Sequence, residues 1–442
     1  MRVVIVGSGG VGESTAAIAR RRDPGRELFE TIVLADWDLA KAEGAVARQG
    51  GDVRFVAERV DASDVDAVVA LCEKHRADVL CSFLPVEFNP YTLRAALKAR
   101  VHHMDASTTL SQPDPEDPFT KANVVLGQDE LELGPEFERI GKLGLMGIGV
   151  EPGMADWYCR YAADHFFDEI DEIGVRYGAN LEIPGFSGIS FGFSIWMTIE
   201  ECTNPAVVWE RDRGFYTVPP LSDPEPFYLP EGIGWVDVAH VEHEEVVHVG
   251  YFEHLLKGVK KATFKYALGD EFIQAMEVFK SVNLHSLKPV TVRGMEGIRP
   301  RDLVEAAAPD PNEIGKLYVG QSCAGTWVRG RKDGREREVY LYQVVDNQDC
   351  VDLYGTQGVV AQTAFPGVVA LELLATDRLA GYKGNPEAGV FPAQAFTCDD
   401  FVSLQKDYGF PGGALEMDSE YKRELDHAGF VAPVEDGAEV AP

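Results

Sequence analysis

Basic residues are scarce in this sequence, and their scarcity excludes whole classes of partner. Lys and Arg number 41 against 72 Asp and Glu among 442 residues, which gives a formal net charge of −31 at pH 7. Phosphate backbones and anionic membrane surfaces are bound by clustered Lys and Arg. The composition therefore predicts that neither nucleic acid nor a membrane is a partner.

Cysteine pairs and long hydrophobic runs are lacking as well. The seven cysteines are widely spaced and none belongs to a CxxC motif, so we expect neither a disulfide framework nor a metal site. The first apolar run ends before Gly7, too early for a signal peptide, and we see no apolar stretch of about 18 residues that would span a membrane. These absences predict a cytoplasmic protein.

A regular alternation of strand and helix patterns fills roughly the first 110 residues. Strands are expected at 2–6, 31–35, 53–60, 78–84 and 101–104, and helices at 13–22, 38–49, 64–75 and 90–100, with Ser63 as the N-cap of the third helix. A further strand is expected at 143–150 and a helix at 154–167. Short strands separated by helices imply βαβ units, and hence a parallel sheet.

The pattern changes after about residue 172, where strand-like runs dominate. They lie at 173–177, 236–240, 245–251, 262–266, 290–293, 318–328 and 338–345, with helices at 198–203 and 271–282. An apolar helical pattern returns at 357–379 and could cover the first sheet. We therefore predict an α/β fold, in which a Rossmann-type, doubly wound parallel sheet carries an inserted α+β second domain built on a mixed sheet.

The most specific motif is a glycine-rich loop between the first expected strand and helix. Its sequence, Gly7-Ser8-Gly9-Gly10-Val11-Gly12, matches GxGxxG. In such a loop Gly7 permits the tight turn, Gly9 lets the backbone approach a pyrophosphate, and Gly12 lets the helix pack against the strand. The helix N-terminus adds free N–H groups and a positive dipole end. The motif predicts a dinucleotide site; the alternative is a glycine-rich turn in a domain that has lost its nucleotide.

An acidic residue stands where such a site needs one. Asp36 ends the second expected strand, 24 residues after Gly12, and could accept hydrogen bonds from the adenine-ribose hydroxyls. Its carboxylate would repel a 2′-phosphate, and Trp37 rather than Arg follows it, so NAD is favoured over NADP. Because ligands bind at the carboxyl ends of parallel strands, further cofactor contacts are expected there. These residues are Asp61, Ala62, Phe83, Leu84, Pro85, Ser107 and Pro152.

Two other catalytic signatures are incomplete or absent. The run from His243 to His248 (HEEVVH) resembles HExxH, but its histidines are five positions apart and cannot share a helix face. The alternation around it favours a strand at the surface or at a cleft edge over a metal site. No Tyr is followed four positions later by Lys, which excludes the proton-transfer pair of short-chain dehydrogenases.

Several segments, in their order along the chain, resemble the saccharopine dehydrogenase (glutamate-forming) family, which includes lysine 6-dehydrogenase and carboxynorspermidine dehydrogenase. They are 78–85 (DVLCSFLP), 101–107 (VHHMDAS), 147–156 (GIGVEPGMAD), 193–196 (FSIW) with 204–206 (NPA), 243–247 (HEEVV), 263–266 (TFKY) and 389–392 (GVFP). Each motif alone is weak, but their joint order covers about residues 1–410.

The resemblance implies a domain organisation and a homodimer. The family's nucleotide-binding domain receives its last helices from the C-terminal part of the chain, and the second domain is inserted between. We therefore expect a dinucleotide-binding domain at 1–150, completed by about 355–395, and a substrate and dimerisation domain at 151–354. Residues 396–442 would form a C-terminal segment with a polar, acidic tail.

The sequence departs from the family pattern at a place that bears on the substrate. Saccharopine-forming members carry an Arg shortly after a Trp-Ser step, used for a substrate carboxylate. Here Trp196 is followed by Met-Thr-Ile and then by Glu200 and Glu201. Glu cannot replace the paired donors of Arg, and two acids would instead suit an ammonium group. The alternative is that both acids are exposed helix residues.

We therefore predict an NAD-dependent oxidoreductase that acts on a C–N bond of an amino-acid or polyamine derivative. It would oxidise an amine to an imine, or condense an aldehyde with an amine reductively. Candidates for proton transfer are Asp105, Glu151 and Asp156, of which Asp156 could instead be an N-terminal capping acid. Lys265 could anchor a substrate carboxylate or be an exposed strand residue.

Three alternatives stay open at this point. The first is a saccharopine-forming reductase that uses glutamate and another arginine, such as Arg176, Arg211 or Arg293. The second is a non-catalytic dinucleotide-binding sensor or scaffold, since function does not follow from fold. The third is an interaction protein that uses its acidic surface, although excess Asp and Glu also serve solubility.

Overall fold

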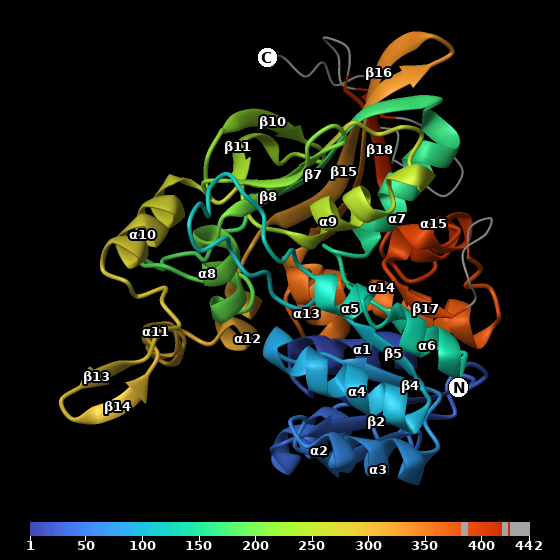
Figure 1. The fold of residues 1–442 in the computed structure, drawn as a ribbon. Helices are drawn as coiled ribbons and strands as arrows, with labels where there is room; N and C mark the ends of the chain where they lie inside the picture. The colour runs from blue at the N-terminus through green and yellow to red at the C-terminus, as the bar shows by residue number, and fades with distance from the viewer. Residues whose placement is uncertain (382–387, 418–422, 425–442) are drawn as a thin grey trace.

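Two sheets form the core of the molecule, one below the other in Figure 1. The computed structural model describes residues 1–381, 388–417 and 423–424. The lower sheet is parallel throughout, and its seven strands follow the order β17-β6-β5-β4-β1-β2-β3. The strand order reverses between β1 and β4, which is the switch point at which doubly wound sheets bind ligands. The strands are β1 (Arg2–Val6), β2 (Thr31–Asp36), β3 (Phe55–Arg59), β4 (Val79–Ser82), β5 (His102–Asp105), β6 (Leu143–Leu145) and β17 (Gly389–Phe391).

Each of the first four strands leads into a helix, as the alternation in the sequence predicts. The helices of this domain are α1 (Gly10–Arg22), α2 (Leu39–Ala47), α3 (Val65–His75), α4 (Asn89–Ala99), α5 (Gln128–Leu131) and α6 (Gly134–Ile140), with the short turn η1 (Val86–Phe88) before α4. The expectation that Ser63 caps α3 is wrong, because Asp64 accepts the N–H of Ala67 at 3.1 Å. The hydroxyl of Ser63 instead donates to Asp61 at 2.6 Å.

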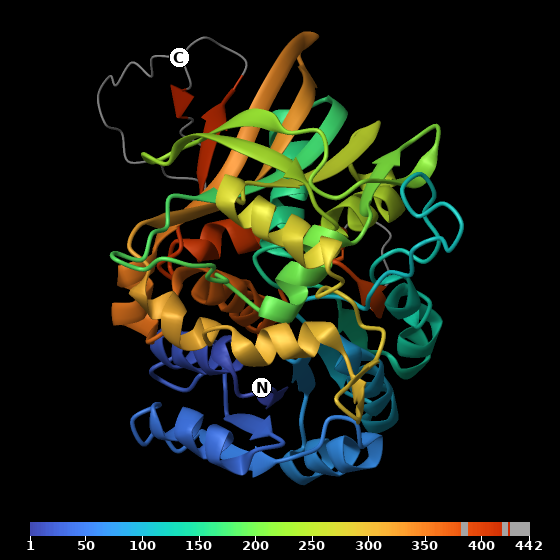
Figure 2. The same ribbon diagram turned by 90° about the vertical axis from the view of Figure 1, so that its left-hand side faces the viewer.

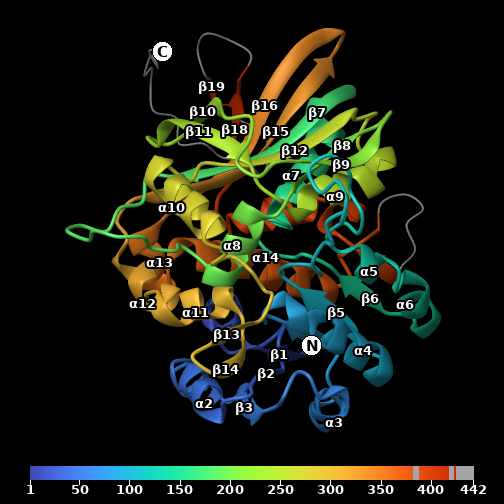
Figure 3. The same ribbon diagram turned by 60° about the vertical axis from the view of Figure 1, so that its left-hand side comes forward.

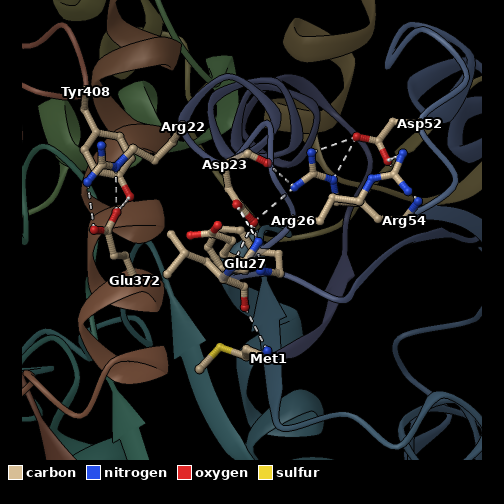
Figure 4. A network of polar contacts seen from close by, with 11 residues as sticks. Met1, Arg22, Asp23, Arg26, Glu27, Asp52, Arg54, Glu372 and Tyr408 are labelled. Carbon is tan, nitrogen blue, oxygen red and sulfur yellow. Dashed lines mark hydrogen bonds and ion pairs between the residues drawn. The ribbon is translucent and has the colours of Figure 1, made fainter.

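The C-terminal half of the chain returns to the lower sheet. Helix α14 (Gly358–Ala375) packs on α1, and β17 pairs with β6. Figure 4 shows the polar contacts of this junction: Arg22 of α1 donates two hydrogen bonds to Glu372 of α14, at 2.8 and 2.9 Å, and the Tyr408 hydroxyl donates to the same carboxylate at 2.6 Å. Bidentate Arg–carboxylate pairs fix geometry as well as charge, so α14 is held rigidly on the first domain.

Helix α14 is also an exception to one expectation from the sequence. Its 18 residues make it long and apolar enough to cross a membrane by length and composition, whereas no such stretch was expected. In this fold most of the helix is buried among other elements, as the core helix of a globular protein would be.

The upper sheet is mixed. It follows the order β10-β11-β12-β7-β15-β16-β18-β19, with β8 added on β12 and β9 on β8, and only β12 and β7 pair in parallel. Its strands are β7 (Glu169–Ala179), β8 (Ala206–Glu210), β9 (Gly214–Val218), β10 (Glu225–Leu229), β11 (Gly234–His240), β12 (Lys261–Tyr266), β15 (Gln321–Lys332), β16 (Arg335–Asp346), β18 (Gly413–Glu416) and β19 (Arg423–Glu424). A separate hairpin, β13 (Val290–Val292) and β14 (Met295–Ile298), projects from the body (Figure 1). The expected polar tail thus begins with a buried strand, β18, and its final acidic run lies outside the described residues.

One predicted strand of the second domain is a helix. Residues 245–251 were expected to be a strand, but α9 (Glu244–Tyr251) occupies them. Every residue from Glu244 to Val249 is buried, so the helix lacks the polar face that would have given it a helical period. The predicted strand at 143–150 is also shorter than expected, since β6 ends at Leu145.

The remaining helices lie between and beside the sheets. They are α7 (Met154–Tyr161), α8 (Ile195–Thr203), α10 (Asp270–Ser281), α11 (Pro300–Ala307), α12 (Pro311–Ile314), α13 (Asn347–Tyr354) and α15 (Asp399–Gln405), with the short turns η2 (Ala162–Phe166), η3 (Glu253–Leu255), η4 (Gly315–Leu317) and η5 (Ala393–Ala395). Figure 3 shows α8, α9 and α14 in the layer between the two sheets, and Figure 2 shows helices between the same two sheets from another side. The predicted fold class, a Rossmann-type domain with a second domain on a mixed sheet, is confirmed.

Candidate active site

The glycine loop has the geometry that a pyrophosphate requires. Gly7 has a φ of +103°, and a Cβ there would lie 2.2 Å from the carbonyl oxygen of Phe83. A Cβ on Gly12 would lie 2.0 Å from the carbonyl oxygen of Gly7, so only glycine lets α1 approach β1 this closely. At Gly9, by contrast, a Cβ would meet no atom within 4 Å. The open face of Gly9, at the N-terminus of α1, fits the phosphates of a dinucleotide.

Asp36 lies against this loop. Its carboxylate accepts the backbone N–H of Ser8 at 3.0 Å and that of Asp38 at 3.1 Å, and its side chain is buried. Trp37 is 70% exposed beside it. The carboxylate is thus fixed at the end of β2 beside the loop, where it could accept the hydroxyls of a ribose.

A cavity of about 600 Å³ opens between the carboxyl edge of the lower sheet and the second domain. Its size is that of a small-molecule site. The predicted site residues that line it are Gly9, Gly10, Val11, Phe83, Leu84, Pro85, Ser107, Glu151, Pro152 and Glu201. Predicted site residues that do not line it are Gly7, Ser8, Gly12, Asp36, Asp61, Ala62, Asp105, Asp156, Trp196, Glu200 and Lys265. The structure therefore brings together the nicotinamide end of the predicted dinucleotide site and two of the predicted acids.

Two of the three candidate proton carriers, Asp105 and Asp156, are buried and do not line the cavity. Asp105 accepts the N–H of Gly147 at 2.7 Å, and burial together with the charge of Glu130 raises its pKa well above the ordinary value. Asp156 accepts the N–H of Gly153 at 3.1 Å, and its Oδ2 lies 2.9 Å from Nδ1 of His248. The geometry of Asp156 is that of the capping acid considered as the alternative.

The third candidate, Glu151, reaches the cavity. It follows the loop after β6, and its Oε1 is buried without a hydrogen-bond partner among the described residues. Burial, and then the nearby charge of Glu245, raise its pKa well above the ordinary value. A buried carboxyl oxygen that lacks a donor can accept a hydrogen bond from a ligand.

Glu200 and Lys265 are satisfied inside the protein. Glu200 forms an ion pair with Arg301, whose guanidinium lies 4.6 Å from the ring of Trp196, and accepts a hydrogen bond from Asn204 at 2.7 Å. The expectation that Glu200 could be an exposed helix residue is wrong, because its side chain is buried.

Lys265 has its own acidic partners. Its Nζ lies 2.9 Å from Asp223 and 3.1 Å from Glu225, and the side chain is buried. The expectation that Lys265 could be an exposed strand residue is therefore wrong as well. An ammonium group with two carboxylate neighbours has little need of a substrate carboxylate.

Sequence reasoning set aside the group that forms the far wall of the cavity. His243 is the N-cap residue of α9 and lines the cavity with Glu244. Its Nδ1 lies 2.5 Å from Oε2 of Glu245, and one ligand atom from each of the three residues falls within 4.8 Å of the others. Because Nδ1 of His243 is already within hydrogen-bond distance of Glu245, this trio suits the ammonium group of a ligand as its hydrogen-bond partner. We call Glu151, Glu201, His243, Glu244 and Glu245 the acidic cluster.

The electrostatics of the cavity are one-sided. Five carboxyl groups line it, those of Glu151, Glu201, Glu244, Glu305 and Asp310, and no Lys or Arg does so among the residues that the structure describes. Burial, opposed by the charge of His243, raises the pKa of Glu201 to about 8. A carboxyl group whose pKa is raised in this way ionises more readily beside an entering cation, so the cavity suits a cationic ligand.

Comparisons with known proteins agree with this arrangement. Residues 3–144 match the family model of the saccharopine dehydrogenase NADP binding domain, and residues 149–406 match that of the saccharopine dehydrogenase C-terminal domain. The chain is 26% identical over 430 residues to carboxynorspermidine synthase of Vibrio alginolyticus, covering 95% of this chain and 98% of that protein. It is also 26% identical over 413 residues to carboxyaminopropylagmatine dehydrogenase of Synechocystis, covering 93% and 96% of the two.

A solved structure supports the same fold. Apo saccharopine dehydrogenase (L-Glu forming) from Saccharomyces cerevisiae superposes with a TM-score of 0.64 at 14% sequence identity, over 96% of this chain and all of that chain. At this level of identity the likeness concerns the fold alone. The resemblance read from the sequence motifs is thus confirmed by the family models and by the curated relatives.

Proposed function

The chain belongs to the saccharopine dehydrogenase family of oxidoreductases, and on that premise we propose that it acts on a C–N bond of a polyamine derivative, with NAD as hydride carrier. The observation that carries this proposal is the cavity lining, which has five carboxyl groups and no Lys or Arg among the described residues. A di- or polyamine carries the opposite charge. Two curated relatives are named for carboxylated polyamine derivatives, which supports the same substrate class.

The residues of the chain would divide the work between the two walls of the cavity. The glycine loop and Asp36 would hold the dinucleotide, with its nicotinamide beside Phe83, Ser107 and Pro152. The nicotinamide, when bound there, supplies or removes the hydride. Glu201 would receive the ammonium group of the substrate, and closure of the cavity between two domains would exclude water from the imine.

NAD is favoured over NADP because the Asp36 carboxylate lies beside the glycine loop at the end of β2, where the adenine ribose would bind. A 2′-phosphate would bring a second negative charge to the same place, where Trp37 follows in the sequence and no Arg does. The matched family model carries the description of an NADP binding domain, so the choice between the two dinucleotides has to be measured.

A saccharopine-forming reaction with glutamate has less support. Glutamate carries two carboxylates and one ammonium group, and a lining without Lys or Arg among the described residues opposes that excess of negative charge. The three arginines considered for the glutamate carboxylate lie elsewhere. Arg176 pairs with Glu225 at 2.9 Å, Arg211 pairs with Glu253 at 2.8 Å, and Arg293 lies at the exposed turn between β13 and β14. None of them lines the cavity.

The proposal is tested by binding and then by turnover. NADH and NADPH are titrated by fluorescence, and absorbance at 340 nm is then followed with diamines, lysine and saccharopine, and with diamines mixed with amino-acid aldehydes. We expect NADH binding and diamine-dependent oxidation of NADH in the aldehyde mixtures. Turnover with glutamate would instead support the saccharopine-forming alternative, and binding without turnover would support a sensor.

A further inference from the structure

One imidazole reaches the cavity at the place where the two domains face each other. His243 lines the cavity as the N-cap residue of α9. The next residue, Glu244, accepts the backbone N–H of Thr108 at 3.1 Å, which ties α9 to the loop after β5. Ser107, in the same loop, lines the cavity too. The ring of His243 is therefore fixed relative to the strand ends at which the nicotinamide is proposed to lie.

Packing determines which ring nitrogen of His243 can meet a substrate. The ring stacks on Phe264 of β12, with the ring centroids 3.9 Å apart and the planes 5° from parallel. Its Nδ1 lies 2.5 Å from Oε2 of Glu245 and 3.3 Å from Oε2 of Glu244. Because the carboxylates occupy Nδ1, Nε2 is the nitrogen that can exchange a proton with a molecule in the cavity.

Carboxyl groups face this imidazole from three elements. Glu244 and Glu245 belong to α9 itself, Glu201 comes from α8, and Glu151 comes from the loop after β6. Burial alone would lower the pKa of His243, but the carboxylates, that of Glu245 above all, outweigh it and hold the pKa well above its ordinary value. These carboxylates therefore favour the protonated form of the imidazole.

Beyond Glu245 lies a second pair of charged groups. Asp156 of α7 and His248 of α9 are 2.9 Å apart, and both are fully buried. The charge of Asp156 contributes to the raised pKa of Glu245, although burial is the larger cause. The Glu245 carboxylate still makes its hydrogen bond to His243, because its Oε2 lies 2.5 Å from Nδ1 of that ring.

From this geometry we propose that His243 is a catalytic residue that donates its Nε2 proton to the reacting molecule, while Glu245 is a positioning residue that fixes the ring. The assignment rests on the proposed function and names the group that moves the proton in it. It adds a residue to the candidates from the sequence, among which Glu151 alone lines the cavity.

In the reductive direction, the amine adds to the aldehyde, so that a C–N bond forms and a carbinolamine results. His243 gives its proton to the carbinolamine hydroxyl, the C–O bond breaks with its electron pair remaining on oxygen, and water leaves. The nitrogen lone pair completes the C=N bond of an iminium. The iminium carbon accepts the hydride that a reduced nicotinamide dinucleotide supplies, which yields a secondary amine. The neutral imidazole then takes a proton from the ammonium group of the next substrate amine, and this frees that lone pair for addition.

The test compares three variants of the full chain with the wild type. His243→Asn keeps a favoured N-cap residue on α9, so the helix is expected to form. Glu245→Gln removes the charge beside Nδ1 but keeps the size of the side chain. His240→Asn is the matched control, because His240 is equally buried three positions earlier but does not line the cavity.

We expect His243→Asn to lower kcat about 100-fold or more while the KM for the amine changes by less than roughly threefold. In the wild type, kcat should fall on the alkaline side at a pH well above the ordinary pKa of histidine. Glu245→Gln should move this alkaline limb to lower pH by about one unit or more, because an adjacent carboxylate shifts a pKa by that amount. His240→Asn should leave both the limb and kcat in place.

A second readout does not depend on turnover. In protein with 15N-labelled histidine side chains, the His243 imidazole signals should report a protonated ring above pH 7 in the wild type and titrate at lower pH in Glu245→Gln. NADH binding and thermal unfolding are measured for each variant to show that it is folded. If His243→Asn fails to fold, the shift of the alkaline limb in Glu245→Gln decides.

The outcomes separate the two proposals. If the wild type oxidises NADH with a diamine and His243→Asn keeps the wild-type kcat and pH profile, the role of His243 is wrong and the proposed function stands. The role is also wrong if Glu245→Gln lowers the rate equally at every pH. If the wild type binds NADH and shows no amine-dependent turnover, the proposed function fails and the assignment of His243 fails with it.

Discussion

The wall of the cavity formed by Gly9, Gly10 and Val11 and the wall formed by Glu201, His243 and Glu244 present different chemistry to a ligand. The first wall, which we call the dinucleotide wall, offers backbone N–H groups, a helix N-terminus and open space. The second wall, which we call the acidic wall, belongs to the acidic cluster and offers a half-buried and a buried carboxyl group beside one imidazole. The first recognises by shape and backbone dipoles, the second by side-chain charge.

The difference lies in how each wall is stable without its ligand. Backbone N–H groups at a helix end can be hydrated at little cost, so the dinucleotide wall needs no compensation. Carboxylates shielded from water cannot, and burial therefore favours the protonated form of two acids that line the cavity: it raises the pKa of Glu201 to about 8 and that of Glu151 well above its ordinary value. Entry of a cation would release those protons. The acidic wall is therefore coupled to pH, and the dinucleotide wall is not.

The largest expected effects distinguish Gly9, which belongs to the dinucleotide wall, from Gly12, which supports that wall from behind the cavity lining. Gly12→Ala would place a Cβ 2.0 Å from the carbonyl oxygen of Gly7, a clash of backbone with backbone, and should lower the free energy of unfolding by about 3 kcal/mol. Gly9→Ala meets no atom within 4 Å and should fold normally. It should nevertheless weaken NADH binding at least about tenfold, because the methyl group takes the space of the pyrophosphate.

The measurements are urea unfolding and fluorescence titration of NADH with both variants. Gly9 has a φ of −77°, which alanine adopts freely, so backbone strain would not explain a loss of affinity. Wild-type NADH affinity in Gly9→Ala would mean that the dinucleotide does not approach this loop, and that the wall at Gly9 does not bind it.

The next effect tests the coupling of the acidic wall to pH. If Glu201 is protonated in the free protein and ionised beside a bound ammonium group, diamine binding releases a proton. The affinity for the diamine should then rise with pH, by nearly tenfold per unit well below pH 8, where the pKa of Glu201 lies. Isothermal titration calorimetry in buffers of different ionisation enthalpy measures the released proton directly.

Two variants make this test specific to the wall. Glu201→Gln should abolish most of the pH dependence and the proton release. Glu242→Gln is the matched control, since the pKa of Glu242 is also raised, to about 7 and chiefly by burial, but its side chain lies outside the cavity. Equal pH dependence in the wild type and Glu201→Gln would contradict the assignment of Glu201 to the ammonium group.

The raised pKa of Glu201 also makes the stability of the folded protein depend on pH. Glu201 binds a proton more tightly in the folded than in the unfolded protein, so its stabilising contribution is full below the ordinary value of 4.5. That contribution is lost as the pH rises through about 8. The melting temperature of the ligand-free protein should therefore fall over this window, and less so for Glu201→Gln.

A smaller effect is expected at Asp36, which lies beside the glycine loop. Asp36→Asn keeps the size of the side chain and the acceptor for the N–H of Ser8, and removes the charge. NADH affinity should fall about tenfold, the value of one charge-assisted hydrogen bond, and NADPH affinity should fall less or rise. Parallel fluorescence titrations with both dinucleotides give the ratio. A wild-type preference for NADPH would show that our interpretation of Asp36 is wrong.

The two walls also differ in how far the sequence predicted them. The glycine loop, Asp36 and the strand ends at Phe83 and Pro152 are local patterns with fixed spacing, and the structure places them where βαβ units require. The acidic wall depends on α9. Because residues Glu244 to Val249 are all buried, their sequence shows no helical alternation of polar and apolar residues, so a strand was predicted there and His243 was not considered a site residue.

Ion pairs between distant residues were equally hidden. Glu200 and Arg301 are 101 positions apart, and Lys265 and Asp223 are 42 positions apart. No local pattern reports that a charged side chain has such a partner, so both residues were candidates for substrate binding. A charged residue inside a predicted core element is better interpreted first as half of an ion pair.

Lys265 lies outside the cavity, and its substitution has the smallest expected effect on the site. Its ammonium group pairs with Asp223 and Glu225, which are partly exposed, so Lys265→Met should cost about 1 to 2 kcal/mol in the free energy of unfolding. The KM values for both the amine and a carboxylate-bearing aldehyde should not change, because Lys265 does not line the cavity. Unfolding curves and steady-state kinetics on one preparation measure both quantities. A selective rise in the KM for the aldehyde would show that Lys265 binds the substrate carboxylate. Because Lys265 does not line the cavity in this structure, that result would mean that the second domain rearranges to bring its ammonium group to the acidic wall.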